Sequence, residues 1–126
     1  CGQHAKMANQ ILVAGTMAGI CESLSYAKTK GLDLQAVLDA LSGGAAGGRQ
    51  LSSSGPKILN EDYAPGFYIR HFVKDMKLAE NKACSSGLNL AVLHQVLQEY
   101  SELMDEGKQY LGTQALVQYY LKSDKK

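Results

Sequence analysis

A long run of residues without a charged side chain, residues 7–21, constrains the fold of this chain more than any other feature. Its apolar side chains point in every direction on a helix, and four small residues stand between positions 14 and 19. A helix that is apolar on all sides is buried on all sides, and small side chains let a second helix approach closely. The run is too short, and too rich in glycine and amides, to span a bilayer. We therefore predict a long central helix over residues 3–30, ended by Gly31.

Further helices are predicted from apolar side chains at helical spacing and from residues that cap helices. Asp33 is a candidate N-cap of the second helix, and Thr113 is a candidate cap of the last one. Gly55 and Pro56 predict that a loop follows a short third helix. The predicted ranges are 34–41, 46–53, 69–86, 91–106 and 114–121. No segment alternates with period two, so we predict an all-α domain, a bundle of five to seven helices around one long buried N-terminal helix.

The composition excludes several classes of function. The chain has 126 residues, 45% of them hydrophobic, which suits one compact domain with its own core. Its formal net charge of +1 lacks the basic excess of a nucleic-acid binder. Cys1, Cys21 and Cys84 are scattered without CxxC spacing, and the histidines are scattered too, so no disulfide framework or zinc site is expected. We predict a cytoplasmic protein with reduced cysteines that binds no metal, nucleic acid or membrane.

One face at the start of the first predicted helix is polar, because residues three or four positions apart lie together. It carries Lys6, Asn9 and Gln10. The two amides can orient a small polar substrate, and the lysine can exchange a proton with a substrate oxygen. The positive end of the helix dipole and partial burial both favour the neutral amine, which suits a general acid and base. The alternative is a surface lysine whose stem lies along the helix, with solvated amides, and spacing alone favours that alternative.

Two short motifs stand far apart in the sequence. The pattern G-x-x-x-K-x-x-N-[NQ] is formed by Gly2, Lys6, Asn9 and Gln10. The pattern PGF followed by K-D-[LM]-x-L-A is formed by Pro65, Gly66, Phe67, Lys74, Asp75, Met76, Leu78 and Ala79. In this order the motifs resemble those of the β-hydroxyacid dehydrogenases, which include 3-hydroxyisobutyrate dehydrogenase and tartronate semialdehyde reductase. The resemblance covers essentially the whole chain and implies their C-terminal helical domain, a fold like the C-terminal domain of 6-phosphogluconate dehydrogenase.

The resemblance implies an oxidoreductase that moves hydride between NAD or NADP and a small β-hydroxyacid, which it interconverts with its semialdehyde. In the family, a Rossmann domain ahead of the helical one binds most of the cofactor. The signature's first glycine would lie before Cys1, so we expect residues 1–126 to be a substrate and dimerisation domain, inactive alone and part of a homo-oligomer. The resemblance implies a catalytic role for Lys6, substrate binding by Asn9 and Gln10, and cofactor binding by Lys74, Phe67 and Asp75.

Each of these assignments has a structural alternative. Lys74 and Asp75 also fit a solvated pair on a charged helix, and Phe67 also fits a core anchor. Asn9 can instead cap or crosslink helices. Gln10 stands where many family members have Asn. The substrates of those members therefore cannot be assigned directly to this chain.

Two further features leave alternatives open. The glycine-rich residues 43–48 either line a substrate pocket or form a flexible connector, and Arg49 after them is a candidate carboxylate ligand. For the whole chain, a non-catalytic helical dimerisation or interaction module remains an alternative to the enzyme. So does a family-like protein that has lost catalysis and binds a metabolite or a partner, although the retention of Lys6 argues against that loss.

Overall fold

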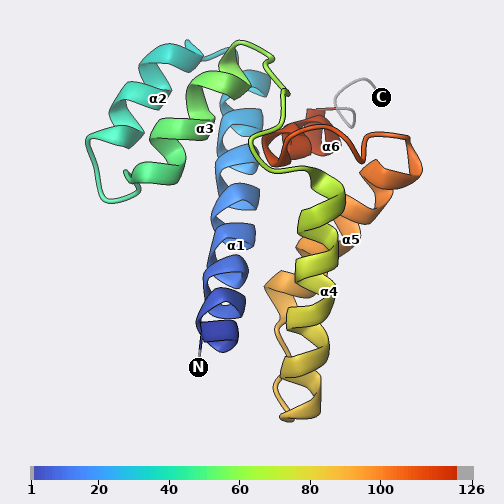
Figure 1. Ribbon diagram of the computed structural model, residues 1–126. Helices are drawn as coiled ribbons and strands as arrows, with labels where there is room; N and C mark the ends of the chain where they lie inside the picture. Colours follow the sequence, from blue (N-terminus) through green and yellow to red (C-terminus); the bar gives the residue numbers. More distant parts are fainter. Residues whose placement is uncertain (1, 122–126) are drawn as a thin grey trace.

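The computed structural model describes residues 2–121, and their regular secondary structure is helical (Figure 1). The elements are α1 (Gly2–Thr29), α2 (Leu34–Ser42), α3 (Arg49–Leu59), α4 (Ile69–Ser85), α5 (Ala91–Asp105), the 3-10 helix η1 (Thr113–Leu116) and α6 (Val117–Leu121). An isolated antiparallel bridge joins Tyr68 to Gly112. Within the described range, no helix is both long and apolar enough to cross a bilayer. The predicted all-α fold is confirmed.

The long helix α1 is the centre of the domain, as predicted. It packs against every other helix of the described chain and runs between the α2–α3 hairpin and the α4–α5 hairpin (Figure 1). Ala14 and Cys21 on α1 are fully buried. The helix is not covered around its whole circumference, however, because Leu12 is 70% exposed and Gly19 is exposed too. The hairpins and α6 therefore leave one apolar strip of α1 open.

The connection from α1 to α2 follows from local sequence. Gly31 adopts φ +73°, and its amide donates to the carbonyl of Lys28. The next amide, that of Leu32, donates to the carbonyl of Ala27, which completes a glycine-based C-cap. Asp33 then caps α2, because its Oδ1 accepts a hydrogen bond from the Gln35 amide at 3.0 Å. The predicted end of the first helix at Gly31 and the predicted N-cap at Asp33 are both confirmed.

The third helix is longer than predicted and lies later in the chain. α3 runs from Arg49 to Leu59 and contains Gly55 and Pro56, which we expected to end it. The physical reason is tertiary packing. A Cβ atom on Gly55 would lie 2.6 Å from Cδ1 of Leu38, so the missing side chain lets α3 pack closely on α2. Burial of the apolar face of α3 offsets the backbone hydrogen bond that Pro56 cannot donate.

The helices predicted over residues 69–86 and 91–106 are confirmed as α4 and α5, each one residue shorter. Phe72 and Tyr100 join them in the core, with ring centroids 5.4 Å apart in an edge-to-face arrangement. Tyr100 is fully buried, and its hydroxyl donates to the carbonyl of Thr113 at 2.7 Å. This contact fixes the start of the C-terminal segment against α5.

The last helix begins differently from the prediction. Gly112, not Thr113, is the residue before the helical segment, and the first turn is the 3-10 helix η1. The Gln114 side chain donates to the carbonyls of Asp62 and Ala64, and the Tyr100 hydroxyl holds Thr113 from the other side. These contacts come from distant parts of the chain, so a local capping rule did not predict them.

A buried carboxylate lies among α1, α5 and α6. Glu99 is only 5% exposed and accepts hydrogen bonds from Nε2 of Gln95 and from the hydroxyl of Tyr120. Burial raises the pKa of the Tyr120 hydroxyl, and its hydrogen bond to Glu99 raises it further. Burial, with Glu99 nearby, also raises the pKa of the Cys21 thiol, so this thiol stays protonated at neutral pH. Cys21 and Cys84 are both free thiols, whereas Cys1 lies outside the described residues.

The close approach at Gly55 predicts a stability change. We expect Gly55→Ala to lower the free energy of unfolding by about 1–3 kcal/mol, because the new methyl group overlaps the buried Leu38 side chain. Urea unfolding followed by circular dichroism measures the change. Gly19→Ala is the matched control: its new Cβ meets no atom within 4 Å, so we expect a gain of about 0.5–1 kcal/mol. Equal effects of the two substitutions would contradict the packing argument.

Candidate active site

A chain of hydrogen bonds connects three of the predicted site residues. Nε2 of Gln10 on α1 donates to Oδ2 of Asp75 on α4 at 3.1 Å. Nδ2 of Asn9 donates to Oε1 of Gln10 at 3.2 Å. The two helices run in opposite directions, so this polar link fixes their register (Figure 1). Sequence reasoning placed Asn9, Gln10 and Asp75 at one site, and the structure brings them together.

Lys6 lies one helical turn before Gln10, about 6 Å along the axis of α1. Its side chain is exposed, so the expected partial burial is wrong. The reason is that Met7 is the one buried residue among positions 3–9, which leaves the first turns of α1 outside the core. Within residues 2–121, the side-chain amine of Lys6 forms no hydrogen bond or ion pair. The amine is therefore free to meet a ligand.

The two remaining predicted site residues lie along and before α4. Lys74 is exposed beside Asp75, and within residues 2–121 it forms no ion pair. Phe67 precedes α4 and is 41% exposed, with its ring edge-to-face against Phe72 at a centroid distance of 5.9 Å. Its carbonyl accepts a hydrogen bond from the amide of Thr113 at 3.2 Å. Phe67 is thus anchored on one side and open to a ligand on the other.

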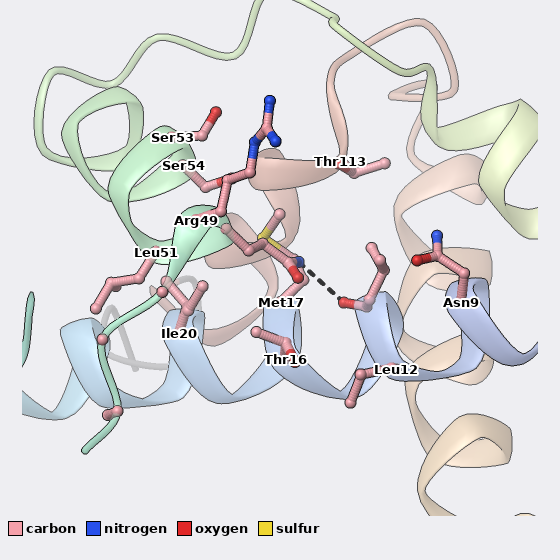
Figure 2. Close-up of a pocket in the computed structure, with 15 residues that line it drawn as sticks. Asn9, Leu12, Thr16, Met17, Ile20, Arg49, Leu51, Ser53, Ser54 and Thr113 are labelled. Carbon is pink, nitrogen blue, oxygen red and sulfur yellow. Dashed lines mark hydrogen bonds between the residues drawn. The ribbon is translucent and has the colours of Figure 1, made fainter.

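A pocket of about 710 Å³ opens next to Asn9, between α1, the start of α3 and η1 (Figure 2). Figure 2 shows Asn9 at one end, Ile20 and Leu51 at the other, and Arg49 and Thr113 between them. The pocket is lined by Asn9, Leu12, Val13, Thr16, Met17, Ile20, Ala46, Gly47, Gly48, Arg49, Gln50, Leu51, Ser53, Ser54 and Thr113. The end of the glycine-rich segment therefore lines a pocket, which was one of its two interpretations.

Sequence reasoning missed several residues of this pocket. Gln50 is anchored across it, because its Nε2 donates to the carbonyl of Val13 at 3.0 Å, the dashed line in Figure 2. Ser53 and Ser54 add hydroxyl groups to the same wall. Thr113 arrives from the other end of the chain and was interpreted only as a helix cap. No local pattern indicates these positions, because they meet only through packing.

The described part of the chain has no group of three or more His, Cys, Asp or Glu side chains that could hold a metal ion. The chemistry available at this site is that of an exposed amine, carboxamides, a carboxylate and an aromatic ring. Such a set can bind and orient a small polar molecule and exchange a proton with it.

Comparison with known proteins identifies the family. The sequence profile of the family described as "NAD-binding of NADP-dependent 3-hydroxyisobutyrate dehydrogenase" matches residues 1–120. The chain belongs to this family. It is the family's C-terminal helical domain, so the resemblance to the β-hydroxyacid dehydrogenases is confirmed. The family's description names an NADP-dependent dehydrogenase, and several relatives are named as 3-hydroxyisobutyrate dehydrogenases or as a reductase.

Three similar proteins, each longer than this chain, illustrate the match. A probable 3-hydroxyisobutyrate dehydrogenase-like 1 protein, mitochondrial, from Arabidopsis thaliana is 47% identical over 92% of this chain and 35% of its own length. The 2-hydroxy-3-oxopropionate reductase of Escherichia coli is 35% identical over 93% of this chain and 40% of its own length. The crystal structure of a 3-hydroxyisobutyrate dehydrogenase from Salmonella typhimurium superposes with a TM-score of 0.87 at 20% identity, covering 91% of this chain and 40% of that one. The chain thus spans less than half of these relatives.

The hydrogen bond between Gln10 and Asp75 predicts energetic coupling of α1 and α4. In a double-mutant cycle of Gln10→Ala and Asp75→Ala, we expect a coupling energy of about 1 kcal/mol in the free energy of unfolding. Urea unfolding of the four proteins measures it. Gln10→Ala with Asp39→Ala is the control pair, because Asp39 lies on α2 and bonds to Gln35 instead. A coupling no larger than that of the control pair would contradict the link.

Proposed function

We propose that this chain is the helical half of an NAD- or NADP-dependent oxidoreductase that interconverts a small β-hydroxyacid and its semialdehyde. The family match over residues 1–120 carries the proposal, and the polar face of α1 supports it. Residues 1–126 form the C-terminal substrate and dimerisation domain, and a Rossmann domain on the N-terminal side completes the active site. This chain alone is inactive. A cytoplasmic location stays a prediction.

Lys6 is the proposed general acid and base. Its ammonium donates a proton to the oxygen of the semialdehyde during reduction, and the neutral amine takes the proton back during alcohol oxidation. Asn9 lies one turn away on the same face and borders the pocket, so its carboxamide orients the substrate. Both polar atoms of the Gln10 amide already bond to protein groups, Asn9 and Asp75. Gln10 therefore holds Asn9 in place in addition to the substrate contact expected of it.

The cofactor would contact this domain along α4. Lys74 has no ion-pair partner within residues 2–121, which fits a cation that meets a phosphate or ribose group. The open part of the Phe67 ring fits the flat surface of a nicotinamide, and Asp75 borders the same face. When bound, NAD or NADP accepts or supplies the hydride. The three residues position it, and the other domain provides most of its binding site.

Lys6→Ala tests the proposed chemistry in the protein that joins this chain to its dinucleotide-binding domain. We expect turnover of small β-hydroxyacids to fall roughly 10²- to 10⁴-fold, because the proton-transfer group is lost. The dissociation constant of the cofactor, measured by fluorescence titration, should stay unchanged. Lys28→Ala removes another exposed lysine of α1 and serves as the matched control, with normal turnover expected. Near wild-type turnover of the Lys6 variant would remove this residue from the mechanism.

The open strip of α1 supports a second role, association between copies of the chain. Ala8, Leu12, Gly15 and Gly19 share this face by their spacing and carry no charge, and the exposed Glu22 is the next residue along it. On the neighbouring α5, Val92 is 65% exposed. An apolar strip of this length, on the central helix of the domain, is typical of a surface that another chain covers. We propose that a homo-oligomer forms through it.

Gly19→Glu tests the association. A side chain at this position meets no atom within 4 Å, so the domain itself should tolerate the change. We expect light scattering to show an oligomer for the wild-type chain at high concentration and a monomer for the variant, because the carboxylate would be buried unpaired in the interface. Ser52→Glu, at an exposed position of α3, is the control and should leave the mass unchanged. A strict monomer for the wild-type chain would contradict the proposal.

A further inference from the structure

We infer that the pocket beside Asn9 binds a second anionic group of the substrate, held by Arg49. This inference rests on the proposed function and deepens it, because it specifies the class of β-hydroxyacid. The substrate carries its usual carboxylate and, in addition, a substituent that ends in an oxyanion. The substituent leaves the reacting end of the molecule near Lys6, passes Asn9 and enters the pocket.

The charge of the pocket supports this assignment. Arg49 is the one charged residue among the residues that line it, and no lining residue is acidic. Within residues 2–121, Arg49 forms no ion pair with any carboxylate. The hydroxyls of Thr16, Ser53 and Ser54 lie in the same lining and can donate hydrogen bonds to an oxyanion. Arg49 is exposed and has no ion-pair partner within residues 2–121, and neutral donors lie in the same lining, which favours an anionic ligand over a cationic one.

The position of Arg49 relative to the reacting end is set by a backbone contact. The neighbouring residue Gln50 bonds to the carbonyl of Val13, which holds the start of α3 against that turn of α1. Val13 lies about 6 Å beyond Asn9 along the helix axis and about 10 Å beyond Lys6. Figure 2 shows the guanidinium of Arg49 on the same side of α1 as the amide of Asn9. One elongated molecule can therefore meet all three side chains.

The size of the pocket favours a substituted acid as well. Pockets of roughly 300–1,000 Å³ commonly enclose ligands much larger than a three-carbon acid. The open pocket of about 710 Å³ next to Asn9 has room for a substituent in addition to a three-carbon acid. A substituent with a terminal oxyanion uses this space and reaches the guanidinium, whose planar fork pairs with carboxylate and phosphate groups alike.

The test uses the complete protein that contains this chain and a matched series of substrates. The series comprises 3-hydroxypropionate and its derivatives with a carboxyethyl, a phosphonoethyl or an uncharged carbamoylethyl group on carbon 2. We expect the wild-type enzyme to favour an anionic derivative over the carbamoylethyl one by roughly 10- to 100-fold in kcat/KM. Arg49→Gln should abolish this preference through KM, with little change in kcat, and Arg49→Lys should restore part of it. The anion with the larger preference distinguishes a carboxylate from a phosphate-like group.

Control variants separate the two proposals. Lys57→Gln removes another cation of α3 that does not line the pocket, so we expect it to keep the preference. No turnover of the substituted acids, no preference between charged and uncharged derivatives, or a preference that survives Arg49→Gln would each overturn the inference. In those cases, a steep loss of 3-hydroxypropionate turnover in Lys6→Ala would leave the proposed function intact. Full turnover by Lys6→Ala would remove only Lys6 from the mechanism, and the proposed function itself would fail if the wild-type complete protein did not turn over 3-hydroxypropionate.

Discussion

The burial of α1 against all the other helices is the interaction on which the rest of the structure depends. Its apolar middle, around Ala14 and Cys21, supplies the shared core of both helical hairpins. The first turns of the same helix extend beyond that core and carry polar side chains, Lys6 and Asn9 among them. Because a helix of this length is stiff, packing in the middle determines where its polar end lies. The candidate active site is thus positioned by apolar contacts several turns away and requires few contacts of its own.

Two side-chain hydrogen bonds then fix the helices that lie beside the polar end of α1. Gln10 bonds to Asp75 and sets the register of α4, whereas Gln50 bonds to the carbonyl of Val13 and sets the position of α3. Both bonds are partly buried, where a polar group left unpaired costs free energy, so each specifies one arrangement of its helix pair. The pocket next to Asn9 lies along α1 beside the second of these bonds. Most of its wall residues belong to packed helices, and residues 46–48 of the connection between α2 and α3 complete it.

The sequence predicted the features of this fold that local chemistry controls. The helix periodicity, the cap at Asp33 and the left-handed turn at Gly31 all require only neighbouring residues, and all are present. The two wrong predictions, the end of the third helix and the cap of the last one, share a different origin. Gly55 stays inside α3 because α2 packs on it, and a long-range network of hydrogen bonds moves the last cap to Gly112. The same limit applies to the site. Motifs along the chain identified the residues that meet across α1 and α4, but the pocket that contains Arg49 arises from segments that no local pattern connects.

The placement of Lys6 near the positive end of a helix becomes understandable from its surroundings. The helix dipole acts mainly within the first turn of α1, which ends before Lys6. Water also solvates the exposed ammonium. The electrostatic cost of placing this cation near the start of the helix is therefore small in this domain. On the proposed function, the Rossmann domain closes over this end of α1 and removes that water. The amine and the substrate oxygen would then face each other in a less polar medium, where electrostatic interactions are stronger. The proton exchange assigned to Lys6 is therefore a property of the assembled cleft. An exposed lysine in the separate domain agrees with this mechanism, because neither half holds the amine in its reactive environment alone.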